Sequence, residues 1–284
     1  MNSISTIQGR WARSLLTAAL LTGLALVLAP GSARAADPCA ETARGVASLK
    51  EGDAFQATAL LFASARLGCE REARTLLMRG ASVDAKDREG ATALAKAAQA
   101  GKTKIVKLLL DKGANVNARS VLGSTPLFYA AEADRAEAVR ALLEHGADPN
   151  LPGRSGLTPF MAAAYNNAGD TVALLLARGA DPNALDREDK SAMVYAAGRA
   201  NTAVVALLIK AGVDVNRRYG HGLSALMWVA GHDSSAGIDD VDASLKLLLQ
   251  HGAATDLKDD RGKTAADIAR DMGREREARL IEGK

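Results

Sequence analysis

Residues 123–150 read GSTPLFYAAEADRAEAVRALLEHGADPN. Apolar residues recur three and four positions apart over 126–133 and again over 136–144, which predicts two short helices. Thr125 can cap the first helix, Pro126 fits its first turn, and Gly146 can end the second helix at positive φ. The stretch therefore predicts two antiparallel helices that end in a turn.

The same pattern returns along the chain every 33 residues. The glycine that ends the second helix recurs as Gly80, Gly113, Gly146, Gly179 and Gly212. The hydroxyl residue that opens the first helix recurs as Thr92, Thr125, Thr158, Ser191, Ser224 and, after a longer step, Thr264. A fixed period of this length predicts a stack of like units that share one continuous core.

This pattern resembles that of the ankyrin-repeat family, G-x-T-P-L-x-x-A-A followed by L-L-L-x-x-G-A-D-x-N, and the resemblance covers about residues 54–284. It implies an all-α fold, a solenoid of stacked helix-turn-helix units with β-turn or hairpin fingers. About six to seven repeats and two terminal caps are expected. A tetratricopeptide array has a 34-residue period and lacks the glycine-linked β-turn, which disfavours it.

The expected repeats are 54–86, 87–119, 120–152, 153–185, 186–218, 219–258 and 259–284, after a capping half-repeat at 36–53. The sixth repeat is longer, because Gly212 and Gly252 lie 40 residues apart. The extra seven residues are expected near 234–240, in the turn between the two helices of that repeat. The charged run at 270–279 suits a C-terminal cap that faces solvent.

Residues 1–35 have the composition of a secretory signal peptide. Two arginines without any acid precede an almost entirely apolar run at 15–29, and Ala-Arg-Ala at 33–35 supplies a small-x-small cleavage pattern. The run is shorter than the roughly twenty residues that a membrane span needs. We therefore expect cleavage after Ala35, export to the periplasm with secretion as second choice, and no membrane insertion of the mature chain. An uncleaved anchor is the alternative.

Cleavage changes the charge of the chain. The full sequence carries a formal net charge of +3, and loss of Arg10, Arg13 and Arg34 leaves 3 − 3 = 0. A chain without net charge has no general attraction for nucleic acid, so nucleic acid is not an expected partner.

Both cysteines, Cys39 and Cys69, lie in the mature part. An even number of cysteines in an exported protein is a candidate for a disulfide, and the repeat register brings both to the starts of neighbouring outer helices. We predict a Cys39–Cys69 disulfide across the N-terminal cap. Two buried free thiols are the alternative.

The family resemblance implies that partners bind on the concave face, through the positions after each turn and after each Ala-Ala pair. Carried over by register, these are Arg88 and Glu89, Val121 and Leu122, Arg154 and Leu157, Arg187 and Lys190, His221 and Leu223, and Arg261 and Lys263, with Gln99, Glu132, Tyr165, Asn166, Arg199 and His232 from the helices. The partner-binding set that we single out is Arg88, Leu122, Arg154, Leu157, Tyr165, Asn166, Arg187, Arg199, His221 and His232. Tyr and Arg dominate interface energies, so Arg154, Tyr165, Arg187 and Arg199 are the expected anchors. The alternative is that these are solvated positions of a regular surface.

Other aromatic and histidine residues suggest structural roles. The register places Tyr129, Tyr195 and Trp228 where each inner helix packs on its neighbours, so we predict core positions for them. His145 and His251 precede the terminal glycine of their repeats and can face the last carbonyl groups of a helix. We therefore interpret both histidines as helix caps.

The sequence contains no metal or catalytic motif with the flanking residues that its mechanism demands. His221, His232 and the acidic insertion match no compact zinc spacing, and a calcium loop counted from Asp233 would need glutamate where Ser244 stands. We expect no metal, no cofactor and no enzymatic activity.

The function that follows is a non-catalytic module that binds a client protein on its concave face in the periplasm, as a monomer. One alternative is an envelope scaffold that binds through its outer helices or the insertion. A second, implied by resemblance to small bacterial proteins associated with catalase and peroxide defence, is an accessory factor for a redox enzyme. A third is an effector secreted into a host.

Overall fold

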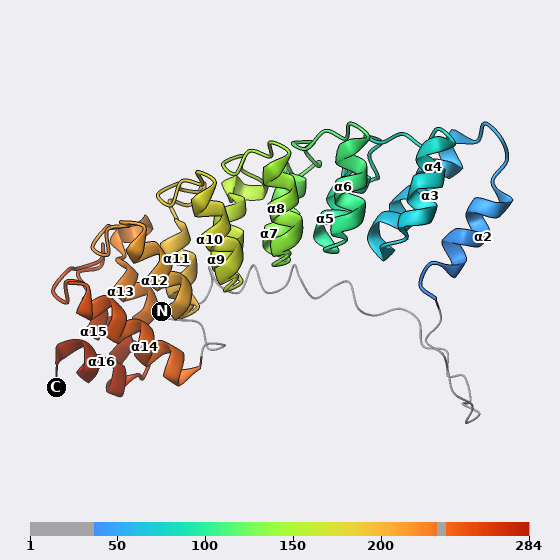
Figure 1. Cartoon of the computed structure of the whole chain (residues 1–284). Coiled ribbons are helices and arrows are strands. Elements are labelled where there is room, and N and C mark those ends of the chain that lie inside the picture. The colour runs from blue at the N-terminus through green and yellow to red at the C-terminus, as the bar shows by residue number, and fades with distance from the viewer. Residues whose placement is uncertain (1–36, 232–236, 284) are drawn as a thin grey trace, which may run out of the picture. The chain divides into compact units, whose positions relative to one another are not determined.

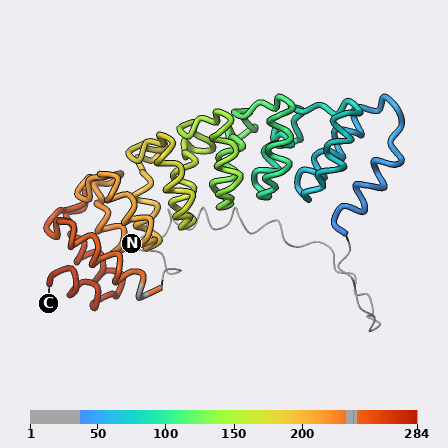
Figure 2. Tube along the Cα trace, viewed as in Figure 1, coloured from blue at the N-terminus to red at the C-terminus, as the bar shows by residue number. Residues whose placement is uncertain are grey.

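The computed structural model describes residues 37–231 and 237–283. Within these two ranges the chain forms fifteen α-helices, two 3-10 turns and no β-strand (Figure 1). Helix pairs stand side by side in the order of the sequence, and Figure 2 follows the backbone through them from the blue N-terminal pairs to the red C-terminal pairs. The prediction of an all-α repeat stack is confirmed.

Each pair consists of a first helix and a second helix. The first helices are α3 (Ala54–Leu67), α5 (Ala93–Gln99), α7 (Pro126–Glu132), α9 (Pro159–Tyr165), α11 (Ala192–Gly198), α13 (Ala225–Ala230) and α15 (Ala265–Asp271). The second helices are α4 (Glu70–Met78), α6 (Thr103–Asp111), α8 (Ala136–Glu144), α10 (Gly169–Ala177), α12 (Thr202–Lys210), α14 (Ile238–Gln250) and α16 (Glu275–Glu282). A lone helix, α2 (Ala40–Ser48), precedes them, and the 3-10 turns are η1 (Arg154–Gly156) and η2 (Gly220–Gly222).

Hydroxyl caps open most of the first helices, as predicted. The Thr125 side chain accepts a hydrogen bond from the N–H of Phe128 at 3.2 Å, and Thr92, Thr158, Ser224 and Thr264 make the same bond three residues on. Ser191 is an exception, because its buried hydroxyl makes no cap bond.

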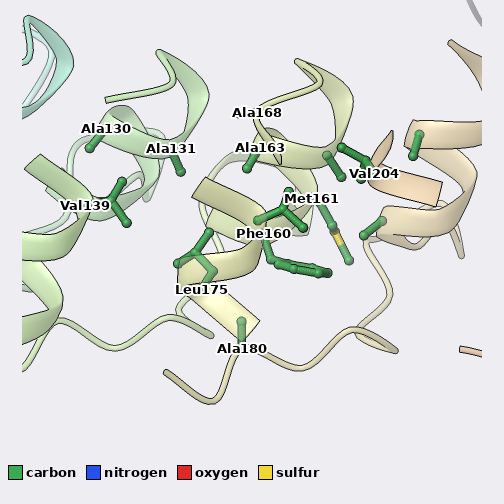
Figure 3. Packing of buried hydrophobic residues seen from close by; sticks show 14 of the residues in the cluster. Ala130, Ala131, Val139, Phe160, Met161, Ala163, Ala168, Leu175, Ala180 and Val204 are labelled. Carbon is green, nitrogen blue, oxygen red and sulfur yellow. The ribbon is translucent and has the colours of Figure 1, made fainter. Parts of the chain in front are cut away.

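The core is built from small and aliphatic side chains. Figure 3 shows alanines of successive pairs beside Phe160, Met161 and Leu175. The paired alanines at 97–98, 130–131, 163–164 and 196–197 are all fully buried. Alanine at these positions leaves room for neighbouring helix pairs to pack closely.

In four of the loops that follow a second helix, one side chain ties the loop to the next repeat. The Asp84 carboxylate accepts a hydrogen bond at 2.9 Å from a backbone N–H 31 residues further along the chain. Asn117 and Asn150 make the same bond with their side-chain oxygens. Asn216 reaches the N–H of Ala254 at 2.8 Å, 38 residues further on, because the sixth repeat is longer. These four residues form a side-chain ladder along the stack.

The insertion of the sixth repeat lies partly in a helix. The second helix of that repeat, α14, has 13 residues, whereas α6, α8, α10 and α12 each have nine. Four extra residues therefore extend α14 by one turn, which corrects the prediction that all seven lengthen the turn. Residues 232–236 lie outside the described part of the chain.

The two ends of the stack are closed differently. At the N-terminal end α2 lies beside α3 and α4 and is joined to α4 by a disulfide. At the C-terminal end α16 exposes Glu275, Arg276 and Arg279, and Arg276 pairs with Asp242 of α14. No helix among the described residues has the length and apolar character that a bilayer crossing requires. The predicted signal peptide and its cleavage site lie outside those residues.

Candidate interaction surface

The loops that precede the first helices α5, α7, α9, α11, α13 and α15 form finger-like turns, at 87–90, 120–123, 153–156, 186–189, 219–222 and 259–262. We call these turns, together with the exposed sides of the first helices, the finger face. In three fingers an aspartate closes the turn: the carboxylates of Asp87, Asp186 and Asp259 each accept two backbone N–H groups at 2.8 to 2.9 Å. These fingers are held by their own side chains.

Two other fingers begin with a residue that cannot do this, Gly153 and Tyr219. Both form a 3-10 turn with two consecutive left-handed residues, Ser155 with Gly156 at φ 58° and 84°, and His221 with Gly222 at 63° and 70°. Neighbouring fingers also bond to each other. The N–H of Arg187 donates to the Ser155 carbonyl at 3.2 Å, and the N–H of Val121 donates to the Glu89 carbonyl at 2.9 Å.

A polar and aromatic cluster lies where α9, α11 and the finger at 186–189 meet. The Arg199 guanidinium stacks over the Tyr165 ring at 4.6 Å, and its Nη1 donates to the Tyr165 hydroxyl at 3.2 Å. Tyr165 in turn meets the Tyr195 ring edge-on, with centroids 6.0 Å apart. The Tyr195 hydroxyl donates to the Asp186 carboxylate at 2.5 Å. These four residues, which we call the Tyr165 cluster, hold one another in place.

Burial and charge tune two titratable groups on this face. Burial, followed by the hydrogen bond to the Asp186 carboxylate, raises the pKa of Tyr195 far above its usual range, so Tyr195 keeps its proton and acts as a donor. Burial also raises the pKa of Glu132, and attraction to Arg154 opposes that rise only in part.

The structure distributes the described members of the predicted partner-binding set over two environments. Arg88, Leu122, Arg154, Asn166, Arg187 and His221 are exposed, whereas Leu157, Tyr165 and Arg199 are half-buried. His232 lies outside the described residues. Tyr165 and Arg199 are brought into direct contact, and Asn166 donates to the Glu132 carbonyl at 2.9 Å.

Two of the wider register positions are corrected. Lys190 and Leu223 are only 9% and 6% exposed, so neither presents a surface to a partner. Each directly follows a finger turn, and its carbonyl accepts a hydrogen bond from the first residue of that turn. The Lys190 carbonyl accepts from the N–H of Asp186, and the Leu223 carbonyl accepts from the N–H of Tyr219. The finger thus turns these residues back toward the stack.

The aromatic residues predicted as core are half-buried. Tyr195 and Trp228 pack against the core, but Tyr129, Tyr195 and Trp228 all keep part of their surface in solvent. Tyr195 belongs to the Tyr165 cluster, which the sequence reasoning missed. Lys96 lies at the register position of Tyr129 and Tyr195 in an earlier repeat. A lysine there indicates that the position reaches solvent, and this is the signal that could have shown it.

The predicted disulfide is confirmed. Cys39 and Cys69 are bonded with Cα atoms 5.5 Å apart, and each immediately precedes a helix, α2 and α4. The buried side chain of Glu72 lies beside the two sulfurs. Together they are the one group of three metal-ligating side chains in the described part of the chain. Both sulfurs are committed to the disulfide, so they offer no thiolate ligand.

The predicted histidine caps are also confirmed. His145 and His251 are the C-cap residues of α8 and α14. Their Nδ1 atoms lie 2.8 and 2.9 Å from the carbonyl oxygens of Ala141 and Leu247, which requires Nδ1 to carry the proton. Both rings therefore satisfy helix carbonyls and take no part in the finger face.

Comparison with known proteins gives two findings and one absence. A family model described as ankyrin repeats, in three copies, matches residues 60–153, 96–186 and 151–219. Among solved structures the chain is similar to the crystal structure of the human ASB11 ankyrin repeat domain, with 26% sequence identity and a TM-score of 0.69 over 79% of this chain and 98% of that chain. Comparison with curated protein sequences finds no match.

Proposed function

Because the chain belongs to the ankyrin-repeat family, we propose that it is an exported, periplasmic module that holds a client protein against the finger face. Ankyrin repeats are interaction scaffolds in general, and stacked repeats create an extended binding surface without a deep enclosed site for chemistry. Binding without catalysis is therefore the activity that this fold supports best.

The Tyr165 cluster is the observation that carries this proposal. Tyr and Arg are the residues that contribute most to interface energy, and here they are fixed before any partner arrives. The ring contact between Tyr165 and Tyr195 and the bond from Tyr195 to Asp186 restrict the side chains that a partner would otherwise have to order. A preorganised aromatic patch loses less conformational entropy on binding.

Export is supported by the leader-like sequence at 1–35 and by the disulfide, which persists in oxidising compartments. Placement in the periplasm is part of the proposal. Fractionation of cells that express the full chain, with mass spectrometry of its N-terminus, tests it. An N-terminus at Ala36 in the periplasmic fraction is expected, and an intact leader in the membrane fraction would contradict it.

Client binding is tested by crosslinking in the native envelope fraction, followed by mass spectrometry. The test variant combines Arg154→Ala, Tyr165→Ala and Arg199→Ala. The matched control combines Lys104→Ala and Lys107→Ala on α6 with Arg178→Ala at the C-cap of α10, three exposed cations outside the fingers. We expect one partner to disappear in the test variant and to remain in the control.

Loss of Tyr165 could also loosen the stack, so the milder pair Tyr165→Phe and Arg199→Lys is crosslinked in parallel and its unfolding midpoint measured. These changes keep the ring and the charge but remove the hydrogen bond and weaken the stacking. A partner that persists in the triple variant would show that the finger face is not the binding surface.

The extended α14 favours one second candidate, an envelope scaffold that binds through the insertion. Its helix is longer than the other second helices by one turn, and deletion of 234–240 restores the 33-residue spacing. If this deletion abolishes the crosslink while the triple variant keeps it, the scaffold reading replaces client binding on the finger face.

A further inference from the structure

The exposed sides of the second helices change character along the stack. In α6 and α8 the exposed positions all carry charged side chains, which are Lys104, Lys107 and Asp111, then Glu137, Arg140 and Glu144. At the same register positions, α10 and α12 carry Asp170, Ala173 and Ala177, then Ala203, Ala206 and Lys210. Alanine therefore fills most of the exposed side of both helices, and one charge remains at one end of each.

The larger apolar side chains next to these alanines are also less covered. Leu108 and Leu110 of α6 and Leu143 of α8 are 5%, 9% and 9% exposed. Their register equivalents in the next two repeats are half-buried, and these are Leu174, Leu176, Leu207 and Ile209. A long charged side chain covers apolar surface with its stem, and alanine has no such stem. Apolar surface is therefore open to solvent on α10 and α12 where the equivalent leucines of α6 and α8 are buried.

We call the four alanines and the four half-buried residues of α10 and α12 the outer apolar face. Apart from Asp170 and Lys210, neither helix contains a charged residue, and a helix that is apolar on all sides is normally buried. The two helices contact each other as neighbours in the stack (Figure 1). The outer apolar face is thus continuous over two repeats, and it lies on second helices, whereas the finger face lies on first helices.

The charges at the ends of this face make it complementary to itself. Asp170 lies in the first turn of α10, and Lys210 lies in the last turn of α12. Within the described part of the chain neither of them forms an ion pair. As equivalent helices of successive repeats, α10 and α12 run in the same direction. A two-fold axis between them would lay α10 of one copy against α12 of another in opposite directions, so that each Asp170 meets the Lys210 of the other copy.

We propose that two copies of the chain associate through the outer apolar face as a symmetric dimer. One patch serves both copies in such an interface, so every contact occurs twice and two equal pairs of Asp170 with Lys210 form. Alanines let the two helix layers approach closely, and the half-buried leucines lose their remaining contact with water. The inference departs from the sequence-based expectation of a monomer, and it does not depend on client binding at the finger face.

The size of the face sets the strength of the dimer. A helix of nine residues is about 14 Å long, and packed helices lie about 10 Å apart. With α8 and α14 at its edges, the contact would cover roughly 500 to 600 Å² of each copy, below the about 800 Å² per partner of a standard interface. A dimer that dissociates at concentrations of about 1 to 100 µM is therefore expected. Both finger faces stay uncovered, so a dimer could hold two clients.

A lipid surface fits the outer apolar face less well than a second copy. Helices that lie on a membrane carry several lysines or arginines and insert large side chains such as Trp and Phe. Neither α10 nor α12 contains an aromatic residue, and the face has one acid for its one lysine. Small side chains and balanced charges suit close packing against another helix layer.

The first test is sedimentation equilibrium of the exported chain over a range of about 1 to 200 µM. The parent is compared with the double variant Ala173→Glu, Ala206→Glu and with the control Lys107→Glu, which changes the same register position on α6. Both lower the net charge by two, and Glu is a good helix former, so the fold should be kept. We expect the double variant to dimerise at least about tenfold more weakly and the control to dimerise as the parent does.

The second test exchanges the charges across the two-fold axis. Asp170→Lys sets two lysines opposite each other, and Lys210→Asp sets two acids opposite each other. Each variant alone should dimerise about tenfold more weakly than the parent, since attraction becomes repulsion in both pairs. An equimolar mixture of the two should regain the affinity of the parent, because each copy then supplies the charge that the other lacks. Unfolding midpoints confirm that both variants are folded.

The outcomes separate this inference from the proposed function. A parent that stays monomeric at the highest concentration would overturn the dimer, as would a dimer that tolerates both glutamates or a mixture that fails to recover. Binding of the monomeric parent to vesicles of phosphatidylglycerol and phosphatidylethanolamine, lost in the double variant, would assign the face to lipid instead. The variant with Arg154→Ala, Tyr165→Ala and Arg199→Ala should dimerise normally, so loss of the client and loss of the dimer are observed independently.

Discussion

The first two repeats and the four that follow place different residues at the positive-φ positions of their turns. Among the described residues up to 118, each residue with positive φ is a glycine. From 119 to 258 six other residues take that conformation: Asp134, Ser155, Asn167, Asp189, Ala200 and His221. A side chain in the left-handed region costs about 1 to 2 kcal/mol, less for Asp and Asn. The central repeats therefore accept backbone strain that the N-terminal repeats avoid.

The strained residues fall into two groups. Ser155, Asp189 and His221 lie in fingers, and Asp134, Asn167 and Ala200 lie in turns between paired helices, whereas the disulfide closes the unstrained end. Strained residues persist where the surrounding structure holds them, and they concentrate at functional sites. Under the proposed function, the unstrained N-terminal repeats anchor the stack and the central repeats carry the client.

The largest expected effect follows loss of the Cys39–Cys69 disulfide. Replacing both cysteines with Cys39→Ser and Cys69→Ser should lower the stability of the N-terminal cap by about 3 to 4 kcal/mol, the loop-closure entropy of a 30-residue loop. Amide hydrogen exchange should show lost protection over α2, α3 and α4 and little change beyond α8, because repeats contact only their neighbours. Reduction of the parent should have the same effect, and uniform loss along the whole stack would contradict the assignment.

The second effect tests the glycines of the unstrained repeats. A Cβ at Gly90, φ 72°, would lie 2.7 Å from the backbone nitrogen of Val121, whereas one at Gly80, φ 87°, would meet nothing within 4 Å. Gly90→Ala should destabilise by about 2 kcal/mol or more and Gly80→Ala by about 1, measured by denaturant unfolding. Equal losses of stability in the two variants would show that a Cβ at Gly90 does not clash with the backbone at Val121.

The third effect has the opposite sign. Asp189 stands at the turn position that glycine fills in other fingers, with φ 57°. Asp189→Gly should stabilise by about 0.5 kcal/mol, since relief of the strain slightly exceeds the entropy that glycine adds to the unfolded chain. Ala177→Gly in α10, where no strain is relieved, is the control and should destabilise. A loss of stability in both would remove Asp189 from the list of strained positions.

The smallest expected effect is on how the stability of the central repeats depends on pH. Burial raises the pKa of Glu132 in the folded state, so the folded chain holds this proton more tightly than the unfolded chain. Stability is therefore greatest below the unfolded pKa and falls as the pH rises through the folded value. Glu132→Gln should flatten this decline in unfolding midpoints between about pH 4 and pH 7. The exposed Glu144→Gln should leave it intact, and a curve unchanged by Glu132→Gln would contradict the assignment.

Much of the fold could be predicted from the sequence, because a 33-residue period fixes helix length, cap and turn at once. The period could not show that Ser191 fails to cap its helix, since this depends on the direction of one hydroxyl. Nor could it show that the insertion extends α14, because a run such as Ile-Asp-Asp-Val suits either a turn or the first turn of a helix.

The candidate site was harder to predict, since register gives a position along the stack but not its depth. It correctly placed Arg88, Arg154 and Arg187 at exposed fingertips, and it placed Lys190 on the surface although the finger folds it inward. The contact between Tyr165 and Arg199 joins side chains 34 residues apart, one repeat plus one position, and depends on rotamers that no pattern encodes.

The side-chain ladder of Asp84, Asn117, Asn150 and Asn216 limits how such a chain can change in length. Three of these bonds join equivalent points of adjacent repeats 31 residues apart, so duplication of a 33-residue unit that carries one of them would repeat the bond. The bond from Asn216 survives a separation of 38 residues because the added residues lie between the two helices of one unit. The stack can therefore grow in two ways that keep these bonds. A whole 33-residue unit can be duplicated, or residues can be inserted between the two helices of one unit, and duplication also lengthens the finger face.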